Sequence, residues 1–191
     1  WQQTIILISL SFVAILPFLI FVARVSVPTA AAQGAGAFRK AIKTAFSDRS
    51  YLCLFFGFFV CGFHVAFIGT HLPAYIADLG LPIIVGGWSL ALIGLFNIAG
   101  SFLAGWSGQI HSKKNMLASI YLSRAVVIAI FILSPVSPMT IYIFSAVMGL
   151  LWLSTVPFTM GLVAQTQGLT YLSTLAGLVF FSHQVGSFTG A

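Results

Sequence analysis

The feature that most constrains the fold of this chain is a series of long apolar runs, each about long enough to cross a lipid bilayer. A helix needs about 20 residues to span the hydrocarbon core. Only helices and closed β-barrels satisfy their backbone hydrogen bonds in lipid, and runs such as YLCLFFGFFVCGF lack the alternation of barrel strands. We therefore predict an all-α membrane protein with six transmembrane helices, at 3–23, 52–72, 84–106, 116–134, 139–163 and 172–191.

Composition supports a lipid environment. Hydrophobic residues make up 60% of the chain and charged residues 5%, whereas about a quarter of the residues in a soluble domain are charged. The formal net charge is +6, but the basic residues flank apolar runs, so we expect no nucleic-acid partner. Cys53 and Cys61 are too far apart on one helix for a disulfide and lack metal-ligand spacing. We expect no metal and no cofactor.

Positive charge falls on alternate connections between the predicted spans, and the positive-inside rule places such connections in the cytoplasm. The connection 107–115 holds Lys113 and Lys114, while 73–83 holds only the acidic Asp78. The connection 24–51 is the most basic, with Arg24, Arg39, Lys40, Lys43 and Arg49.

Within the connection 24–51, apolar residues recur every four positions at Phe38, Ile42 and Phe46. The basic residues fall between them. This pattern predicts a short amphipathic helix that lies on the inner membrane surface.

Polar side chains inside the apolar runs are the candidate functional residues, because each is costly in lipid and usually faces a bundle interior. At about 1.5 Å per residue, five predicted helices bring such groups to a similar depth near the midplane, where secondary transporters bind their solutes. Asn97 is also consistent with interhelical hydrogen bonding, and Arg124 with pairing to a carbonyl. The candidates for a substrate cavity are His64, Asn97, Arg124, Trp152, Thr155, His183 and Gln184.

Proline and small residues predict local features of the helices. Pro157 removes the backbone hydrogen bond to the carbonyl of Leu153, so we expect a helix kink there. Gly186 and Gly190 form a GxxxG pair, and Ser173 with Gly177 forms a second pair of small residues. Both pairs favour close contact between helices.

The stretch GWSGQIHSKKNML, residues 105–117, has two interpretations. With six spans and His183, its Gly-x-Ser-Gly resembles the rhomboid intramembrane proteases, which use a Ser–His dyad. Ser107 lies at the end of its predicted span and His183 near the middle of another, so they differ in depth by about 10 Å. A dyad needs hydrogen-bond contact, and the HxxxN of that family is missing because Ile68 follows His64 by four residues. We therefore do not expect an enzyme.

The same stretch also resembles the signature turn of the major facilitator superfamily, G-x-L-A-D-R-x-G-R-K. Gly105 matches its first glycine, and Lys113 with Lys114 matches its final basic pair. Gln109 replaces the acidic residue and Ser112 the second glycine, so a charged latch is missing. The stretch is similar to the degraded copy that often follows the eighth helix of that family.

Other segments strengthen this resemblance. SYLCLFFGFFVCGFHVAFIGTHLPAYIADLG, MGLLWLSTVPFT and GLVFFSHQVGSFTGA are similar to the seventh, tenth and eleventh helices of bacterial members. They most resemble the branch of monocarboxylate and oxalate–formate porters. The resemblance implies a fragment of a twelve-helix fold, helices six to eleven, in a bacterial inner membrane. Residues 1–23 would end the first half-bundle, 24–51 would form the cytoplasmic linker, and 52–191 would form the truncated second half-bundle.

The resemblance implies a secondary active transporter for a small organic solute, such as a monocarboxylate-type anion, working by alternating access. Its partners would be the solute, protons, the lipid bilayer and the N-terminal half-bundle of the same chain. His64 and His183 are candidates for proton coupling, because histidine titrates near physiological pH. Better-known monocarboxylate porters carry an arginine in the eighth helix, where this chain has Asn97, and Arg124 lies in the ninth. The alternatives are a rhomboid-like protease using Ser107 and His183, and efflux of drug-like compounds.

Overall fold

The computed structural model describes residues 2–3, 5–6, 9–10, 13 and 35–191. The predicted first span at 3–23 and most of the predicted linker before residue 35 therefore lie largely outside the described residues. The chain divides into two units, residues 1–35 and 36–191. In the first unit residues 2–3, 5–6, 9–10 and 13 are helical, and everything below concerns the second unit.

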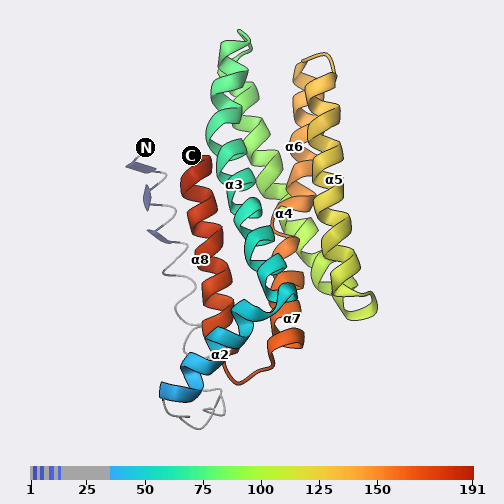
Figure 1. Cartoon of the computed structure of the whole chain (residues 1–191). Helices are drawn as coiled ribbons and strands as arrows, with labels where there is room; N and C mark the ends of the chain where they lie inside the picture. Colours follow the sequence, from blue (N-terminus) through green and yellow to red (C-terminus); the bar gives the residue numbers. More distant parts are fainter. Residues whose placement is uncertain (1, 4, 7–8, 11–12, 14–34) are drawn as a thin grey trace. The chain divides into compact units, whose positions relative to one another are not determined.

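The second unit is built from helices, with no strand among the residues that the structure describes. This confirms the all-α prediction. Figure 1 shows α8 lying beside α3, and α6 beside α4 and α5. In chain order the helices are α2 (Ala35–Ser47), α3 (Arg49–Asp78), α4 (Ile83–Ile110), α5 (Lys113–Leu133), α6 (Pro138–Trp152), α7 (Thr155–Gln167) and α8 (Leu172–Gly190).

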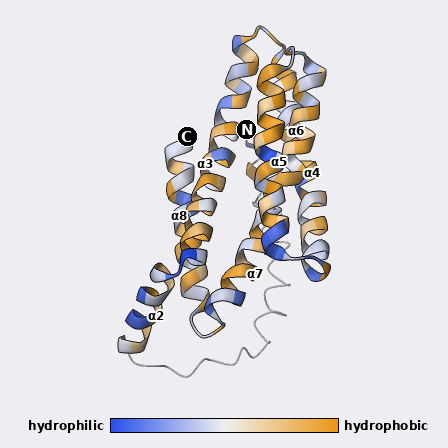
Figure 2. Ribbon diagram, turned by 45° about the vertical axis from the view of Figure 1, so that its right-hand side comes forward, coloured by the Kyte–Doolittle hydropathy of each residue, from blue (hydrophilic) through white to orange (hydrophobic). Residues whose placement is uncertain are grey.

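Within the described part of the chain, four segments are long and apolar enough to cross a membrane. They are α3, α4, α5 and the pair α6–α7 taken as one segment, Pro138–Gln167. Helix α8 coincides with the predicted sixth span and has 19 residues, but it is not among these four. Figure 2 shows hydrophobic residues along the long helices, whereas hydrophilic residues gather on α2.

Glycine lets α3 and α8 approach until their backbones touch. Gly186 lies against the carbonyl of Phe59 and Gly190 against that of Phe63, so a methyl group at either position would overlap the backbone of α3. The Ser182 hydroxyl reinforces the pair by donating to the carbonyl of Phe55 at 2.7 Å. The GxxxG prediction is confirmed.

The second predicted pair of small residues makes no close helix contact at Gly177 within the part of the chain that the structure describes. Instead, α4 and α6 form the other close pair in this unit. Gly100 of α4 lies against the carbonyl of Leu150, and Gly149 of α6 lies against the carbonyl of Ile93. Glycine spacing within one helix could not identify this pair, since each helix contributes a single glycine.

The predicted fifth span, 139–163, is interrupted rather than kinked at its proline. Helix α6 ends at Trp152 and α7 begins at Thr155, so the chain leaves the helix at Leu153 and Ser154. Pro157 is the third residue of α7, where an amide would have no partner within its own helix. The proline does free the Leu153 carbonyl, as predicted, and the amide of Val156 bonds to it at 3.0 Å.

Candidate functional site

The interruption between α6 and α7 collects polar groups from several helices. A helix that ends inside a bundle leaves carbonyls at its C-terminal end and amides at the start of the next helix without partners. Such groups are expensive to bury unless they are hydrogen-bonded. In this molecule, side chains from α4 and α5 supply the missing partners.

Arg124 of α5 is the central residue of this site. Its side chain is 1% exposed. One terminal nitrogen donates to the carbonyl of Leu151 at 2.5 Å and also to that of Trp152, and the other donates to the Cys61 sulfur at 3.2 Å. The guanidinium thus occupies the C-terminal end of α6, where the helix dipole favours a cation.

Tyr121 supports Arg124 from one turn earlier on α5. The guanidinium carbon lies 5.6 Å from the centre of the Tyr121 ring, a distance at which the ring face attracts a cation. The Tyr121 hydroxyl donates to the carbonyl of Gly57 at 2.7 Å, which fixes the ring against α3.

The positive charge of Arg124 is balanced by dipoles rather than by a carboxylate. The chain has two acidic residues, Asp48 and Asp78, and they flank α3 at its two ends. Arg124 contacts α3 at Cys61, which is about 20 Å or more along the helix axis from either one. The site therefore carries a net positive charge inside an apolar bundle.

Asn97 of α4 satisfies the other side of the interruption. Its side-chain oxygen accepts a hydrogen bond from the amide of Leu153 at 3.1 Å. Thr155, the first residue of α7, lies with its hydroxyl 3.4 Å from the Cys61 sulfur. The structure thus brings together four of the predicted residues, namely Asn97, Arg124, Thr155 and, through its carbonyl, Trp152.

His183 lies on α8, where it faces α3. Its ring centre is 4.8 Å from that of Phe58, and its Nδ1 lies 3.5 Å from the Ser187 hydroxyl. Gln184, the next residue, is exposed on α8. Gln184 therefore makes no contact with the interruption, whereas His183 lies beside Cys61, which contacts Arg124 and Thr155.

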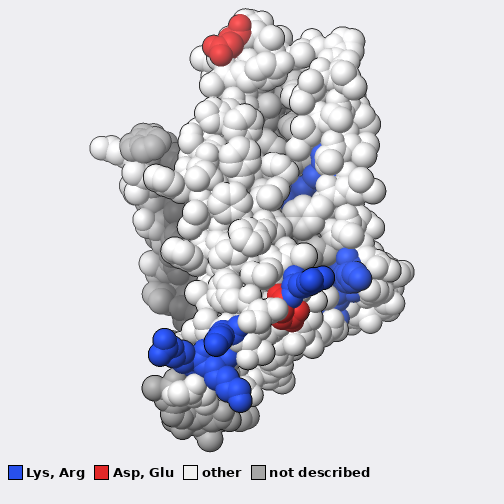
Figure 3. Space-filling model, in the orientation of Figure 1, with Lys and Arg blue, Asp and Glu red and all other residues white. Residues whose placement is uncertain are grey.

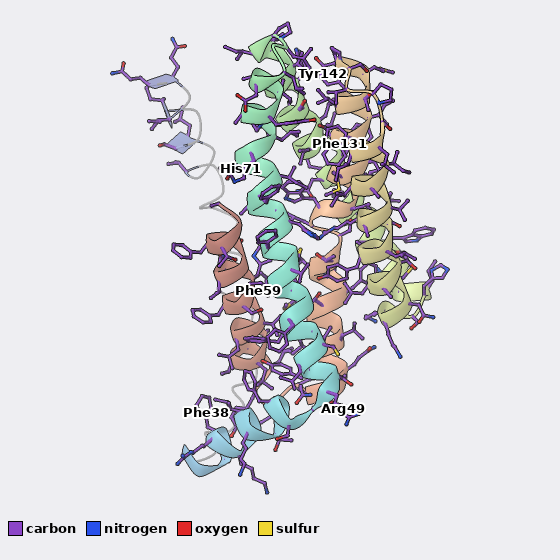
Figure 4. All side chains as sticks on the ribbon, turned by 45° about the horizontal axis from the view of Figure 1, so that its top comes forward. Phe38, Arg49, Phe59, His71, Phe131 and Tyr142 are labelled. Carbon is purple, nitrogen blue, oxygen red and sulfur yellow. The ribbon has the colours of Figure 1, made fainter. Side chains whose placement is uncertain are left out.

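His64 contributes to a different feature, an apolar groove of about 440 Å³ between α3, α5 and α6. His71 lies two helical turns after His64 on the same face of α3. It also lines the groove, opposite Phe131 of α5 (Figure 4). The Nδ1 atom of His64 is buried and has no hydrogen-bond partner among the described residues. The other lining residues are aromatic or aliphatic.

Sequence reasoning missed Cys61 and Tyr121. The sequence offered only that Cys61 forms no disulfide with Cys53 and lacks metal-ligand spacing, although Cys61 lies one turn from His64 and at the depth predicted for Arg124. Its sulfur contacts both Arg124 and Thr155. The shared depth of Cys61 and Arg124 in the bilayer could have indicated their contact. The role of Tyr121 follows only from the orientation of its ring.

The predicted signature turn is shorter than expected, because α4 continues through most of it. Gly105 and Gln109 lie in the last turns of α4, while Lys113 and Lys114 begin α5. Only His111 and Ser112 connect the two helices. No heavy atom of the described residues lies within 4 Å of where a side chain of Gly105 would begin.

Ser107 and His183, the residues of the protease interpretation, have different partners. The Ser107 hydroxyl donates to the carbonyl of Ala104 in its own helix at 3.3 Å, and His183 lies against Phe58 and Ser187. Among the described residues, no group of three or more His, Cys, Asp and Glu side chains could hold a metal ion.

Long apolar helices, close glycine contacts and an interrupted helix around a buried cation define a multi-pass α-helical membrane protein. The chain belongs to the Major Facilitator Superfamily, whose family model matches residues 1–191. It is 28% identical over 137 residues to a Bacillus subtilis (strain 168) protein named as the uncharacterized MFS-type transporter YcxA. That match covers 69% of this chain and 33% of the relative, so the chain spans about a third of the relative's length. No solved structure matches the chain.

Proposed function

We propose that this chain forms part of a secondary active transporter that moves a small organic solute by alternating access. The observation that carries the proposal is the interrupted span α6–α7, with polar groups of α3, α4 and α5 bonded around it. Discontinuous helices near the bilayer midplane commonly form solute sites in secondary transporters. Family membership and the printed name of the Bacillus relative support the same class of function.

The solute we propose is a monocarboxylate-type anion. The buried charge of Arg124 has no carboxylate partner in this chain, so it favours an anion in the adjacent part of the bundle. Arg124 itself is buried behind the α6 carbonyls. We therefore assign Arg124 an electrostatic and positioning role and the equally buried Thr155 a positioning role. We assign direct contact with the solute to the remaining cavity candidates Asn97, Trp152, His183, Gln184 and His64.

Alternating access would use the interruption at Leu153 and Ser154 as a pivot between α6 and α7. Arg124 holds the end of α6 while Asn97 holds the amide of Leu153, so both would keep the backbone satisfied as the two segments change their angle. A second half-bundle of the same polypeptide would complete the solute path. The basic connections would face the cytoplasm of a bacterium, with the spans in its inner membrane, and no covalent chemistry is involved.

Proton coupling is the second part of the proposal, with His183 and His64 as the residues that would carry the proton. The test uses the complete natural polypeptide in liposomes and measures uptake of labelled short monocarboxylates with and without an inward proton gradient. We expect gradient-driven uptake that His183→Ala abolishes. His111→Ala is the matched control, because His111 is exposed in the connection between α4 and α5, and it should leave uptake unchanged.

Each failure in this experiment removes a different part of the proposal. Uptake that ignores the gradient would contradict proton coupling. No uptake of any monocarboxylate would contradict the solute class, and drug-like compounds would then be tested. The groove between α3, α5 and α6 favours that second candidate, because it is lined by aromatic rings that suit bulky apolar solutes.

A further inference from the structure

We propose that helix α2 binds the phosphate groups of anionic phospholipids through Arg39, Lys40 and Lys43, and thereby fixes the membrane surface against the ends of α3 and α8. This interaction is separate from solute transport and does not depend on the solute. It rests on the two faces of α2, on the residues that continue it into α3, and on the distribution of charge over the second unit.

One face of α2 is packed onto the bundle. Ala45 is fully buried. The ring of Phe46 meets the rings of Tyr51 and Phe55 edge-on, both at 5.4 Å between centres. Phe38 meets Tyr171, which precedes α8, at 5.9 Å. The helix is therefore held at the starting ends of α3 and α8.

The other face of α2 presents three cations. Arg39, Lys40 and Lys43 are all exposed, and α2 contains no acidic residue. The chain's two carboxylates do not neutralise them. Asp48 accepts from the amide of Ser50 and from the Gln167 side chain at 2.7 Å, and Asp78 lies at the opposite end of α3.

The position of α2 places these cations at the boundary of the bilayer. Helix α3 starts two residues after α2 ends and is apolar enough to enter a membrane. Phe38 and Phe46 are 40% and 38% exposed beside the cations. A helix that shows both exposed aromatic rings and cations suits the interface between headgroups and acyl chains.

Charge in the second unit is concentrated at this same end. Figure 3 shows most Lys and Arg side chains at the end of the unit where α2 and α3 meet, with one group of acidic atoms among them and another at the far end. Arg49 begins α3, and Lys113 with Lys114 begins α5. Phosphate groups pair strongly with such side chains, and the densest source of phosphate at this boundary is the lipid headgroup layer.

Headgroup binding at α2 would act on more than one helix. The Asp48 side chain, which caps α3, links it to Gln167 at the end of α7. The Tyr51 hydroxyl donates to the carbonyl of Leu175 in α8 at 2.9 Å. Lipid held by α2 would thus stabilise the ends of α3, α7 and α8 in their present arrangement.

The experiment reconstitutes the complete polypeptide in nanodiscs of neutral phosphatidylcholine, with and without phosphatidylglycerol. Native mass spectrometry counts the retained phosphatidylglycerol, and hydrogen exchange follows the amides of residues 36–47. We expect selective retention of phosphatidylglycerol and about tenfold slower exchange in α2, an effect of the size that basic residues produce at an anionic surface. Salt should weaken both effects.

Two double variants remove the same charge from the same end of the molecule. Lys40→Gln with Lys43→Gln should abolish the selectivity and the slower exchange, whereas Lys113→Gln with Lys114→Gln should leave most of both. All four side chains lie at the surface or near it, so neither variant should unfold the protein. Equal loss in both variants, or no preference for phosphatidylglycerol in the wild type, would overturn the proposal. Slower exchange produced by polyglutamate in neutral nanodiscs, without phosphatidylglycerol, would point to an acidic protein partner instead and overturn it too.

Discussion

Among the residues that the structure describes, two membrane-spanning segments contain an interior proline, yet only one of them is interrupted. Helix α3 runs without a break from Arg49 to Asp78 through Pro73, whereas the segment Pro138–Gln167 stops at Trp152 and restarts at Thr155. The surroundings differ. Pro73 packs against Gly86, between the buried side chains of Leu72 and Ile76.

The comparison teaches that neighbouring side chains, rather than the proline, decide where a helix can break. The proline in α3 removes one backbone hydrogen bond, and the many other hydrogen bonds of this long helix keep it continuous. An interruption costs several, and in lipid it persists only where the freed groups find other partners. Arg124 and Asn97 supply those partners at Leu151, Trp152 and Leu153.

The largest expected effect comes from removing the guanidinium that closes the interruption. Arg124→Leu leaves the carbonyls of Leu151 and Trp152 buried without a donor, at about 1–3 kcal/mol each. We expect the free energy of unfolding in detergent to fall by about 3 kcal/mol and solute uptake to be lost. Arg124→Lys, which keeps the charge but not the paired geometry, should lose about half as much stability.

Ser123→Leu is the control for that pair, because Ser123 precedes Arg124 on α5 and its side chain is exposed. It should leave stability and uptake unchanged. If Arg124→Leu were as stable as the wild type, the interruption would not depend on its hydrogen bonds, and the contrast with α3 would need another cause.

An intermediate effect on stability is expected where the continuous helix α3 packs against α8. Gly186→Ala places a methyl group into the carbonyl of Phe59, and overpacking of this kind costs about 1–3 kcal/mol. Gly177→Ala is the matched control on the same helix, since Gly177 faces open space. It should be neutral or stabilising, because alanine favours helix by about 1 kcal/mol.

Thermal unfolding of the two purified variants in one detergent measures this difference. Equal melting temperatures would mean that α3 and α8 can separate without cost. The close packing of α8 would then not be what keeps α3 a continuous helix.

The smallest effect is expected from the proline near the interruption. Pro157 is the third residue of α7, where its missing amide hydrogen has no helical partner to lose. Pro157→Ala should therefore change stability by no more than about 0.5 kcal/mol and leave the interruption in place. Hydrogen exchange at Leu153 and Ser154 should stay as fast as in the wild type, and protection equal to that of α3 would contradict the comparison.

Much of the fold follows from the sequence, because hydropathy locates the apolar centres of helices of membrane length, although their ends differ by up to six residues. The runs at 52–72 and 84–106 lie within α3 and α4, the run at 116–134 passes the end of α5 by one residue, and the GxxxG of α8 marks a real contact. The interruption between α6 and α7 was harder to predict from the sequence. Its position depends on Asn97 and Arg124, which lie on other helices and reach it only after packing.

The candidate site was predictable in depth but not in contact. Counting residues from the helix ends indicated that Asn97, Arg124 and Thr155 lie at similar depth, and the structure joins all three to the interruption. Depth does not fix the direction in which a side chain points. His64 therefore lies in the groove between α3, α5 and α6, and Gln184 is exposed on α8.

The contact between Arg124 and α6 also bears on the order in which the chain is made. The carbonyls that accept its hydrogen bonds belong to residues 27 and 28 positions later, which a ribosome adds in about 1–6 s. Until then the cation of α5 lacks its two carbonyl acceptors, and the insertion cost of an arginine at the helix centre is about 3 kcal/mol. The helix α5 gains its full stability in the bilayer only when α6 arrives, so the two should leave the translocon as one unit.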